Sequence, residues 1–564
     1  MRMKDKIISL LEKEGISKEL VSQALEVPKE PAFGDYAFPC FSLAKELKKS
    51  PVEIAKELAS KIKSPELEKV EAKGPYLNFF INRSSLAQEV IKQILKEKDR
   101  YGSSKIGSGK TIVIDYSAPN IGKPMHVGHI RSTLIGDSLK RIFLFQGYNV
   151  KGINYLGDIG LHVGKLIVAC ELWLDKTSLK KDPIKELFRL YVKFCEYEKS
   201  ELDNEEEDYE GNEWTKKAKE KLKLIEEGDK KTIEIWRKIE KSSLEGFNRI
   251  YKILGINFDE TTGQSRFSEK GKSIIKEAVK KGIAVKEKDS EAVFIELSPL
   301  PKKYILRSNG TASYITQDIG AAIERFEKFK FEKMVYVTDY RQQLHFQQLF
   351  AILARIGLSF SSKCIHIPFG TLKFGNEIIA TRAGKVILLE EVLEKTIEKA
   401  RDEIQKRNSG GEPEKIALAA LKYSALKTEP IRDAVFSWEK AMHFEGDTGP
   451  YLLYTYARAR NILRKANYKK AVKFSAGSPD NLEKNLISQL GQFPQGASNA
   501  FQQYAPNLIA NYSFQIAQAF NEIYHKNQVI GSEEESFRLM LVDAFSQVLK
   551  NALHLLGIRV LEKM

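Results

Sequence analysis

The pattern that most constrains the fold is an alternation of apolar strands and helices over residues 111–156. TIVIDY, which begins at Thr111, is a short apolar run typical of a buried strand. A loop follows, a helix is predicted from about Met125, and VKGINYL is predicted to be the next strand. A strand, helix and strand in this order form a βαβ unit, so the pattern predicts the start of a parallel sheet.

The same alternation returns between Tyr304 and Gly357. YILRS and SYIT are expected to flank a hairpin turn at Asn309-Gly310. A helix is predicted from Gln317, KMVYVT is predicted as a strand, and another helix is predicted from Gln342. The strand–helix alternation is thus expected to resume after a long interruption.

The remaining regions differ in pattern from the α/β part. Residues 1–90 read as helices followed by short strands, of which GPYLNFFIN is the clearest, and GSSKIGSGK at 102–110 reads as a linker. From about Cys170 to Asp289 the chain is expected to be a charged and mostly helical insertion, with a solvated acidic run at 203–210. After about Glu412 the chain is expected to be helical.

Charge points to a polyanionic partner. The 564 residues include 90 Lys and Arg against 75 Asp and Glu, a formal net charge of +15, and phosphate contacts require such cations. The four cysteines form no CxxC pair, so neither a zinc site nor a disulfide framework is expected. No signal peptide and no apolar run of about 20 residues is evident, which predicts an intracellular protein without a membrane span.

The most specific motif is SAPNIGKPMHVGH, which runs from Ser117 between the first strand and the first helix. His126 and His129 are three residues apart, so they are expected on one face of a helix whose first turn accommodates Pro124. The free N–H groups of a helix start attract phosphate, and two imidazoles there suit charge that develops in nucleotidyl transfer. Gly128 lacks a side chain, which would let a base or ribose approach the backbone.

This motif resembles the HIGH signature of class I aminoacyl-tRNA synthetases, and SAPNIGKPMHVGHIRST is similar to the form found in arginyl-tRNA synthetases. Further stretches resemble that family in order along nearly the whole chain: FGDYAF, GPYLNFFIN, INYLGDIG, SNGTASYITQDIGAA, VTDYRQQLHFQQLF, FEGDTGPYLLYTYARARNILRK, ANYSFQIAQAFNEIYH and VLKNALHLLGIRVLEKM. The resemblance implies a multidomain α/β protein with a Rossmann-like catalytic domain, a small α+β N-terminal domain and an all-α C-terminal anticodon-binding bundle.

The expected domain boundaries follow from this resemblance together with the pattern. They are 1–100 for the tRNA-elbow-binding domain, 101–110 for a linker, 111–370 for the catalytic domain with its insertion at about 171–290, 371–411 for a KMSKS-like loop and connecting helix, and 412–564 for the anticodon-binding domain.

The second class I signature, KMSKS, is poorly preserved. The corresponding loop is expected at residues 380–385, where Arg382 and Lys385 are the available cations. Pyrophosphate departure needs positive charge, and family members that lack the signature are thought to rely on a lysine at the position of Lys123. ATP binding is therefore assigned to His126, Gly128, His129 and Lys123, and catalysis to these cations and the two histidines.

The arginine pocket is expected at the ends of the parallel strands. The resemblance implies that Tyr314 and Asp318, one helical turn apart, contact the guanidinium, and that Asp115, Asn120 and Gln342 hold the other end of the substrate. A carboxylate suits a guanidinium because the pair can form two parallel hydrogen bonds.

One departure concerns the same pocket. The family carries a glutamate where this chain has Gln264, which supplies an acceptor without a charge. Either Asp259 or Glu260 takes over, or arginine binds more weakly.

RNA contacts are expected at both ends of the chain. Tyr451, Tyr454 and Arg458 lie near one helical stripe, and aromatic rings beside cations suit an unpaired RNA loop. An aromatic stripe of this kind is also typical of a helical core. The resemblance further implies that Tyr76 and Asn78 contact the tRNA elbow.

The resulting hypothesis is a cytoplasmic, monomeric arginine–tRNA ligase with ATP–Mg²⁺, L-arginine and tRNA(Arg) as substrates, and with no tightly bound cofactor or metal. The family often needs bound tRNA for the activation step, which would be a form of induced fit. The alternatives are a class I synthetase for another amino acid, a noncatalytic tRNA-binding relative, and a small-molecule nucleotidylyltransferase.

Overall fold

The computed structural model describes most of the chain. The described residues are 3–28, 30, 33–64, 66–81, 83–202, 212–308, 310–374, 388–407, 410–469 and 479–564. The chain separates into two compact units, each built from segments far apart in sequence. The first comprises Met1–Tyr101, Ile462–Gln492 and Gln518–Val548, and the second comprises Gly102–Asn461, Phe493–Ala517 and Leu549–Met564.

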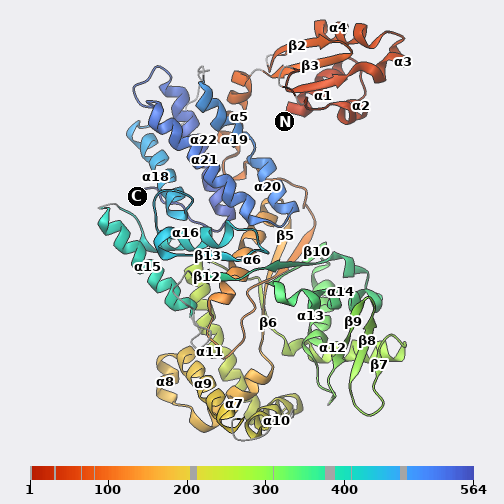
Figure 1. The fold of residues 1–564 in the computed structure, drawn as a ribbon, viewed down its shortest axis with the longest axis vertical. Coiled ribbons are helices and arrows are strands. Elements are labelled where there is room, and N and C mark those ends of the chain that lie inside the picture. The colour runs from red at the N-terminus through yellow and green to blue at the C-terminus, as the bar shows by residue number, and fades with distance from the viewer. Residues whose placement is uncertain are drawn as a thin grey trace. The chain divides into compact units, whose positions relative to one another are not determined.

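A five-stranded, entirely parallel sheet forms the centre of the second unit (Figure 1). Its strands, in spatial order, are β11 (Cys364–Phe369), β10 (Lys333–Asp339), β4 (Thr111–Asp115), β5 (Asn149–Leu156) and β6 (Glu260–Gly263). The chain moves from β4 through β5 to β6 on one side and later returns to β10 on the other. The strand order therefore reverses between β4 and β10, and ligands of such sheets bind at this point, beyond the carboxyl ends of the strands.

Helices cover both faces of the sheet. Helix α6 (Val127–Phe145) contacts β4, β5 and β10, whereas Val113 of β4 packs into the apolar core formed with α13 (Tyr314–Phe329) and α14 (Gln343–Arg355). Ile112, Val113 and Ile114 are fully buried, which explains the uninterrupted apolar run TIVID.

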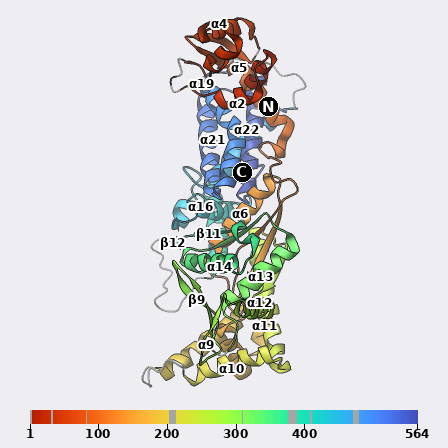
Figure 2. The ribbon, with the colours of Figure 1, turned by 90° about the vertical axis from the view of Figure 1, so that its right-hand side faces the viewer.

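The interruption between β5 and β6 is helical. It consists of α7 (Leu161–Trp173), α8 (Lys176–Lys181), α9 (Pro183–Leu202), α10 (Glu213–Glu227) and α11 (Lys230–Leu254). Helix α7 packs against α9, α10 and α11, and both views show these helices together (Figures 1 and 2). The acidic run at 203–210 lies outside the described residues.

The stretch that was expected to be mostly helical up to Asp289 contains a strand that the sequence analysis did not predict, at residues 260–263. These residues form β6, which pairs in parallel with β5 from Ile153↔Glu260 to Leu156↔Gly263. The strand was hidden because ETTG is short and polar, as an edge strand can be, and it has no apolar pattern to reveal it. Helix α12 (Ser268–Lys280) follows it.

A second small sheet precedes α13. It is antiparallel and contains β7 (Val285–Lys286), β8 (Val293–Leu297) and β9 (Leu300–Leu306). The prediction of a strand at SYIT is wrong, because α13 already begins at Tyr314, and Asn309 of the expected hairpin turn lies outside the described residues. Ser313 caps this helix, since its N–H donates to Thr316 Oγ1 at 3.1 Å, and the cap outweighs the strand propensity of Tyr314 and Ile315.

The remainder of the second unit is mainly helical, as expected, apart from one short strand. That strand, β13 (Ala434–Phe436), pairs in parallel with β12 (Leu372–Phe374). The helices after β12 are α15 (Leu389–Lys406), α16 (Pro413–Leu426), α17 (Trp438–Ala441), α18 (Gly449–Lys465), α20 (Phe493–Gln502), α21 (Pro506–Lys526) and α22 (Glu535–Leu555). Of these helices, Ile462–Lys465 of α18, Gln518–Lys526 of α21 and Glu535–Val548 of α22 belong to the first unit.

The first unit contains a three-stranded antiparallel sheet in the order β1 (Tyr36–Pro39), β3 (Tyr76–Ile81), β2 (Leu67–Lys73). Helices α1 (Met3–Lys13), α2 (Lys18–Ala24) and α4 (Pro51–Lys61) enclose its core, in which Leu11, Phe38 and Phe79 are fully buried. Shorter helical pieces are α3 (Ala44–Leu47) and the 3-10 turn at Cys40–Leu43. Helix α5 (Arg83–Glu97) packs against α19 (Asn481–Gly491) in the same unit.

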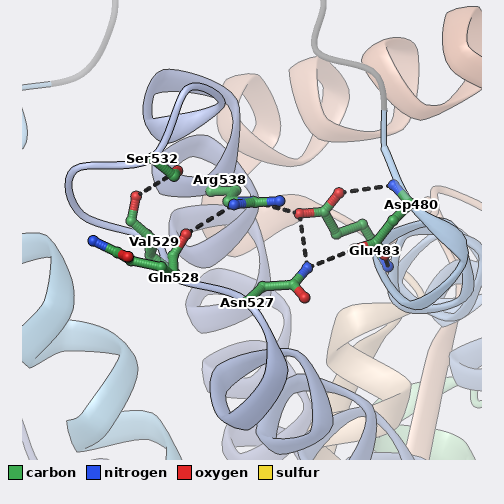
Figure 3. A network of polar contacts seen from close by, with 7 residues as sticks. All are labelled: Asp480, Glu483, Asn527, Gln528, Val529, Ser532 and Arg538. Carbon is green, nitrogen blue, oxygen red and sulfur yellow. Dashed lines mark hydrogen bonds and ion pairs between the residues drawn. The ribbon is translucent and has the colours of Figure 1, made fainter.

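A buried polar network holds α19 to the loop before α22 (Figure 3). Glu483 is 1% exposed, and its carboxylate accepts from Arg538 Nε at 2.7 Å and from the Asp480 N–H at 2.9 Å. Asn527 Nδ2 donates to Asp480 Oδ2 at 2.6 Å, and Arg538 Nη1 donates to the carbonyl of Gln528 at 2.8 Å. Each charged group in the network therefore has a partner within the network.

Candidate active site

The loop between β4 and α6 is clamped in an unusual backbone conformation. Ser117 has φ +74° and Ala118 has φ +48°, values that side chains rarely adopt. The N–H of Ser117 donates to Ser132 Oγ at 3.0 Å, and the N–H of Ala118 donates to Asn154 Oδ1 at 3.2 Å. Backbone strain that is held in place by surrounding bonds is typical of ligand sites.

The two signature histidines accept backbone hydrogen bonds at the start of α6, His126 from Gly128 and His129 from His126. The helix begins at Val127, two residues later than expected, so His126 is the N-cap residue and Pro124 precedes the helix. His126 Nδ1 accepts from the Gly128 N–H at 3.0 Å, and His129 Nδ1 accepts from the His126 N–H at 3.2 Å. The two rings lie 4.0 Å apart between centroids. This cap accounts for the spacing of three residues between the two histidines.

The cap also determines the protonation of the imidazoles. Because each Nδ1 accepts a hydrogen bond, the proton of each neutral ring must be on Nε2. Burial lowers the pKa of His126 and lowers that of His129 to about 3. Both rings are therefore neutral near pH 7, and each keeps one N–H donor for an oxygen of a ligand.

Gly128 is required by the cap itself. A Cβ on this residue would lie 2.6 Å from Cε1 and 2.8 Å from Nδ1 of His126. The space that was expected for a base or ribose is thus occupied by the His126 ring on this side. Any larger residue would disturb the hydrogen bond that sets the His126 tautomer.

Lys123 lies in the same loop and has an aromatic partner. Its Nζ is 4.3 Å from the ring centroid of Tyr191 on α9. Burial lowers the pKa of Lys123, and no carboxylate among the described residues forms an ion pair with it. Arg382 and Lys385, the other expected cations, lie outside the described residues.

Asp115, at the end of β4, already has a strong partner. Its carboxylate pairs with Arg325 of α13 at 2.8 Å, and both side chains are nearly inaccessible. Burial raises the pKa of Asp115 to about 6 despite that partner. The expected direct contact between Asp115 and a substrate therefore competes with a buried ion pair.

The side chains of Asn120 and Tyr314 lie close to two glycines that follow β5, Gly157 and Gly160. A Cβ on Gly157 would lie 1.9 Å from Asn120 Oδ1, and a Cβ on Gly160 would lie 3.0 Å from Tyr314 Oη. The two glycines thus allow both polar side chains to approach the carboxyl end of the sheet. Tyr314 is 49% exposed and lines a cavity of about 310 Å³ together with Gly160 and Gln317.

Asp318 is hydrogen-bonded to a histidine that the sequence did not single out. His345 Nε2 lies 2.7 Å from Asp318 Oδ2, and the two residues come from α13 and α14. Gln342 is exposed at the N-cap of α14. Tyr314 and Asp318 thus lie in the first two turns of α13, and Gln342 lies just before α14.

The uncharged Gln264 lies after β6, and its Oε1 is buried without a hydrogen-bond partner. Neither replacement carboxylate suits the expected role, because Asp259 pairs with Lys140 at 2.7 Å and Glu260 pairs with Lys328. Another acidic group of this segment's surroundings is Asp158, which accepts from the Ser265 N–H at 2.8 Å and whose pKa is raised by burial.

Buried polar atoms without partners gather around these residues. They include Tyr155 Oη, Arg325 Nη2 and Tyr336 Oη, and the Arg325 guanidinium lies 4.7 and 5.9 Å from the Tyr155 and Tyr336 rings. Gln264 Oε1 and Gln317 Oε1 are also without partners. Unsatisfied groups of this kind are costly, so their concentration indicates a place for water or a polar ligand.

The expected RNA-contact residues are only partly accessible. Tyr451 packs edge-on against Phe514 at 5.7 Å, and Arg458 lies 4.8 Å from the Tyr454 ring. All three α18 residues are half-buried. In β3, Tyr76 packs edge-on against Phe41 at 5.8 Å, whereas Asn78 is only 2% exposed and its Oδ1 has no partner. Asn78 is therefore poorly placed for a direct contact with RNA.

Sequence reasoning missed several residues of this region. Arg325 had a signal, since it lies seven residues after Asp318 on an amphipathic helix and so shares its inward face. His162 had a weaker one in the stretch after INYLGDIG; its Nε2 lies 3.2 Å from the Gly157 carbonyl, and burial lowers its pKa to about 4. His345 lies within the stretch VTDYRQQLHFQQLF but was not singled out there, and Tyr191 had no signal, because it reaches the site only through a tertiary contact.

Comparisons with known proteins agree along the whole chain. Residues 90–438 match the family model for the catalytic domain of class I tRNA synthetases (R), residues 452–564 match a DALR anticodon binding domain, and residues 1–81 match an arginyl tRNA synthetase N-terminal domain. No helix within the described ranges is long and apolar enough to cross a membrane.

Similar curated proteins carry the same name. The arginine–tRNA ligase of Clostridium perfringens is 40% identical over 575 aligned residues that cover 99% of each chain. That of Halothermothrix orenii is 39% identical and covers 100% of this chain and 99% of its own.

Solved structures show the same fold. The arginyl-tRNA synthetase of Thermus thermophilus has a TM-score of 0.75 at 24% identity and covers 100% of this chain and 99% of its own. The enzyme of Plasmodium falciparum gives 0.73 at 22% identity, with the same coverage. Because a family model matches more than half of the chain and full-length relatives are about 40% identical, this protein belongs to the arginyl-tRNA synthetases of class I.

Proposed function

We propose that this synthetase activates L-arginine with ATP–Mg²⁺ and transfers it to the 3′ end of tRNA(Arg). The observation that carries the proposal is the reciprocal cap of His126 and His129, which leaves two neutral Nε2–H donors beside Lys123 at the reversal of strand order. Donors and a cation in this position match the charge that develops on phosphate oxygens during adenylyl transfer.

The activation step uses these groups in sequence. The arginine carboxylate attacks the α-phosphate of ATP, a new C–O–P link forms, and the bond to the β-phosphate breaks to release pyrophosphate. The two Nε2–H donors stabilise the α- and β-phosphate oxygens, and Lys123 stabilises the leaving pyrophosphate together with Arg382 and Lys385. The terminal 2′-hydroxyl of tRNA then attacks the arginyl carbonyl, and AMP leaves.

Arginine selection is assigned to Tyr314 and Asp318. The Asp318 carboxylate is oriented by His345 and accepts from the guanidinium, while the exposed Tyr314 ring covers the alkyl chain. Asn120 and Gln342 contact the α-amino and carboxylate end. Asp115 acts indirectly, since it is engaged with Arg325, and that pair fixes the end of β4 under the substrate.

The tRNA is proposed to contact the N-terminal domain, 1–100, through Tyr76 and the C-terminal domain, 412–564, through Tyr451, Tyr454 and Arg458. The catalytic domain would extend over 111–370 after a linker at 101–110, with the KMSKS-like loop in 371–411. We expect a cytoplasmic monomer.

The test is arginine-dependent exchange of pyrophosphate into ATP, measured with each of the twenty amino acids and with or without tRNA(Arg). Exchange with arginine alone supports the proposal, and dependence on tRNA supports induced fit. Exchange with a different amino acid contradicts the pocket assignment. Lys123→Ala should lower the exchange rate far more than it weakens arginine binding.

Gln264 keeps a second candidate function open, namely activation of another amino acid. Its buried amide oxygen brings no charge to a pocket meant for a cation, and Asp259 and Glu260 are already paired with lysines. Gln264→Glu distinguishes the two functions. We expect it to lower the KM for arginine, whereas an enzyme for an uncharged substrate would lose activity when a second carboxylate is placed beside Asp158.

A further inference from the structure

The helical insertion contacts Lys123, the cation assigned above to the leaving pyrophosphate. Tyr191 lies on α9, and its ring faces Lys123 Nζ at 4.3 Å between nitrogen and ring centroid. One turn further along α9, Cys195 forms a side-chain hydrogen bond with Tyr191, and a turn later Glu198 pairs with Lys165 of α7. The same face of α9 therefore carries both the ring that contacts Lys123 and the carboxylate that anchors the helix to α7.

The charge of Lys123 is not neutralised there. Both carboxylate oxygens of Glu198 are engaged, one by Lys165 and the other by Thr215 Oγ1 at 2.6 Å. Lys165 adds a further positive charge near Lys123, and the surrounding burial disfavours the ammonium form. Lys123 in turn disfavours protonation of His126, His129 and His162, which places its charge beside the histidines of the site.

The choice of a ring as partner has a chemical consequence. A carboxylate at this position would pair with Lys123 and would have to be displaced before a phosphate could bind. The face of an aromatic ring attracts a cation through its quadrupole but leaves the ammonium with its full charge and its three N–H donors. Such a partner directs the lysine without competing strongly with the nucleotide.

We propose that Tyr191 is the positioning residue for Lys123, so that the helical insertion, through α9, determines where this cation meets the ATP phosphates. This inference rests on the proposed function, because it takes the role of Lys123 from there. Tyr191 itself does not touch the reacting atoms. Its effect on the reaction passes through Lys123.

The experiment first compares three single variants with the wild type by arginine-dependent pyrophosphate exchange and by direct binding of ATP–Mg²⁺. Tyr191→Leu removes the ring and should lower kcat about tenfold, as loss of a partly desolvated cation–π contact implies. Tyr191→Phe keeps the ring face and should retain most of the rate. Tyr197→Leu removes an exposed tyrosine of the same helix, and it should leave the rate unchanged.

The decisive arm is a double-mutant cycle with Lys123→Met. If Tyr191 acts through Lys123, adding Tyr191→Leu to Lys123→Met causes no further loss of exchange. An equal additional loss in that background would show that the ring only supports the fold and would overturn the inference. Pentafluorophenylalanine at position 191 keeps the ring shape but reverses its quadrupole, so it tests the contact even if Tyr191→Leu does not fold.

The two proposals fail in different ways. If the wild-type enzyme shows no exchange with any amino acid, the proposed function is contradicted. ATP binding then still tests the role of Tyr191, because Tyr191→Leu should weaken ATP binding only when Lys123 is present. Normal exchange in Lys123→Met contradicts the assigned role of Lys123 and the inference together. Loss in Lys123→Met with wild-type behaviour in Tyr191→Leu contradicts the inference only.

Discussion

Two polar clusters of this protein differ in how completely their hydrogen bonds are satisfied. Around Glu483 and Arg538, every charged group has partners within the network (Figure 3). At the carboxyl ends of the sheet strands, Lys123 has no carboxylate partner among the described residues, and Gln264, Tyr155 and Tyr336 each have an unpaired buried polar atom.

This difference distinguishes polar groups that stabilise the fold from polar groups that are available to bind a ligand. A buried charge that only supports the fold must be paired, because an unpaired one costs several kcal/mol. A binding site must instead leave donors and acceptors available for its substrate, and other parts of the structure offset their cost. The unpaired polar atoms at the carboxyl ends of the strands are therefore consistent with the site that the sequence motif indicates.

The largest expected effect is on the structural cluster. Glu483→Ala leaves Arg538 without its carboxylate and removes half of the capping box of α19, so the free energy of unfolding of this unit should fall by about 3–5 kcal/mol. Protection of α19 amides from hydrogen exchange measures the loss. Exchange of pyrophosphate at a temperature where the variant is folded should stay at the wild-type rate.

A matched control uses apolar replacement of both partners. Glu483→Met with Arg538→Met leaves no buried charge unpaired, so it should lose less stability than Glu483→Ala. If the double variant were the less stable of the two, the network would contribute more than mutual neutralisation.

The second expected effect is a lower catalytic rate without a lower free energy of unfolding. His129→Asn removes one Nε2–H donor and should lower kcat roughly 10²–10³-fold, about 2.7–4 kcal/mol, by analogy with loss of a single transition-state donor. His366 of β11 provides a control histidine. Its ring is stacked on that of Phe346 of α14, with 4.6 Å between the centroids. A comparable loss of rate in His366→Gln would remove the distinction between the two clusters.

The third effect concerns substrate affinity. Asp318→Asn keeps the side-chain shape but removes the charge expected to meet the guanidinium, so the KM for arginine should rise by about 10²-fold, roughly 2–3 kcal/mol, while kcat changes less. His345→Gln retains a donor to Asp318 and should raise the KM much less. An unchanged KM in Asp318→Asn would place the guanidinium elsewhere.

The smallest effect is the dependence of stability on pH. Burial lowers the pKa of His129 to about 3 and those of His162 and His366 to about 4. Between their unfolded value of about 6.5 and these values the folded protein binds fewer protons than the unfolded chain, so the free energy of unfolding falls as pH decreases. Asp115, with its pKa raised to about 6, opposes this trend between pH 6 and about 4.

His366→Gln isolates one of these contributions. Removal of the imidazole should reduce the slope of the free energy of unfolding against pH by up to about 1.4 kcal/mol per pH unit between pH 6.5 and 4. Urea unfolding of the variant and of the wild type at several pH values measures the slope. Identical slopes would mean that His366 protonates with little cost in the folded protein.

Much of the parallel sheet was accessible from sequence because its strands are buried on both faces. TIVID and VKGINYL are near-continuous apolar runs, and KMVYVT is similar, so each reveals itself without knowledge of its neighbours. β6 remained hidden, since an edge strand of four residues needs no apolar pattern. The start of α13 was also missed, because the Ser313 cap prevails over the strand propensity of the residues after it.

By itself the sequence determined the βαβ unit, the HIGH motif between its first strand and helix, and the resemblance that leads to the family. These features are local, since periodicity and spacing along a few turns specify them. Only the tertiary structure decided that Asp115 pairs with Arg325, that His345 contacts Asp318, and that the Tyr191 ring contacts Lys123. Such contacts join residues of different elements, and their energies depend on burial and geometry that no spacing along the chain records.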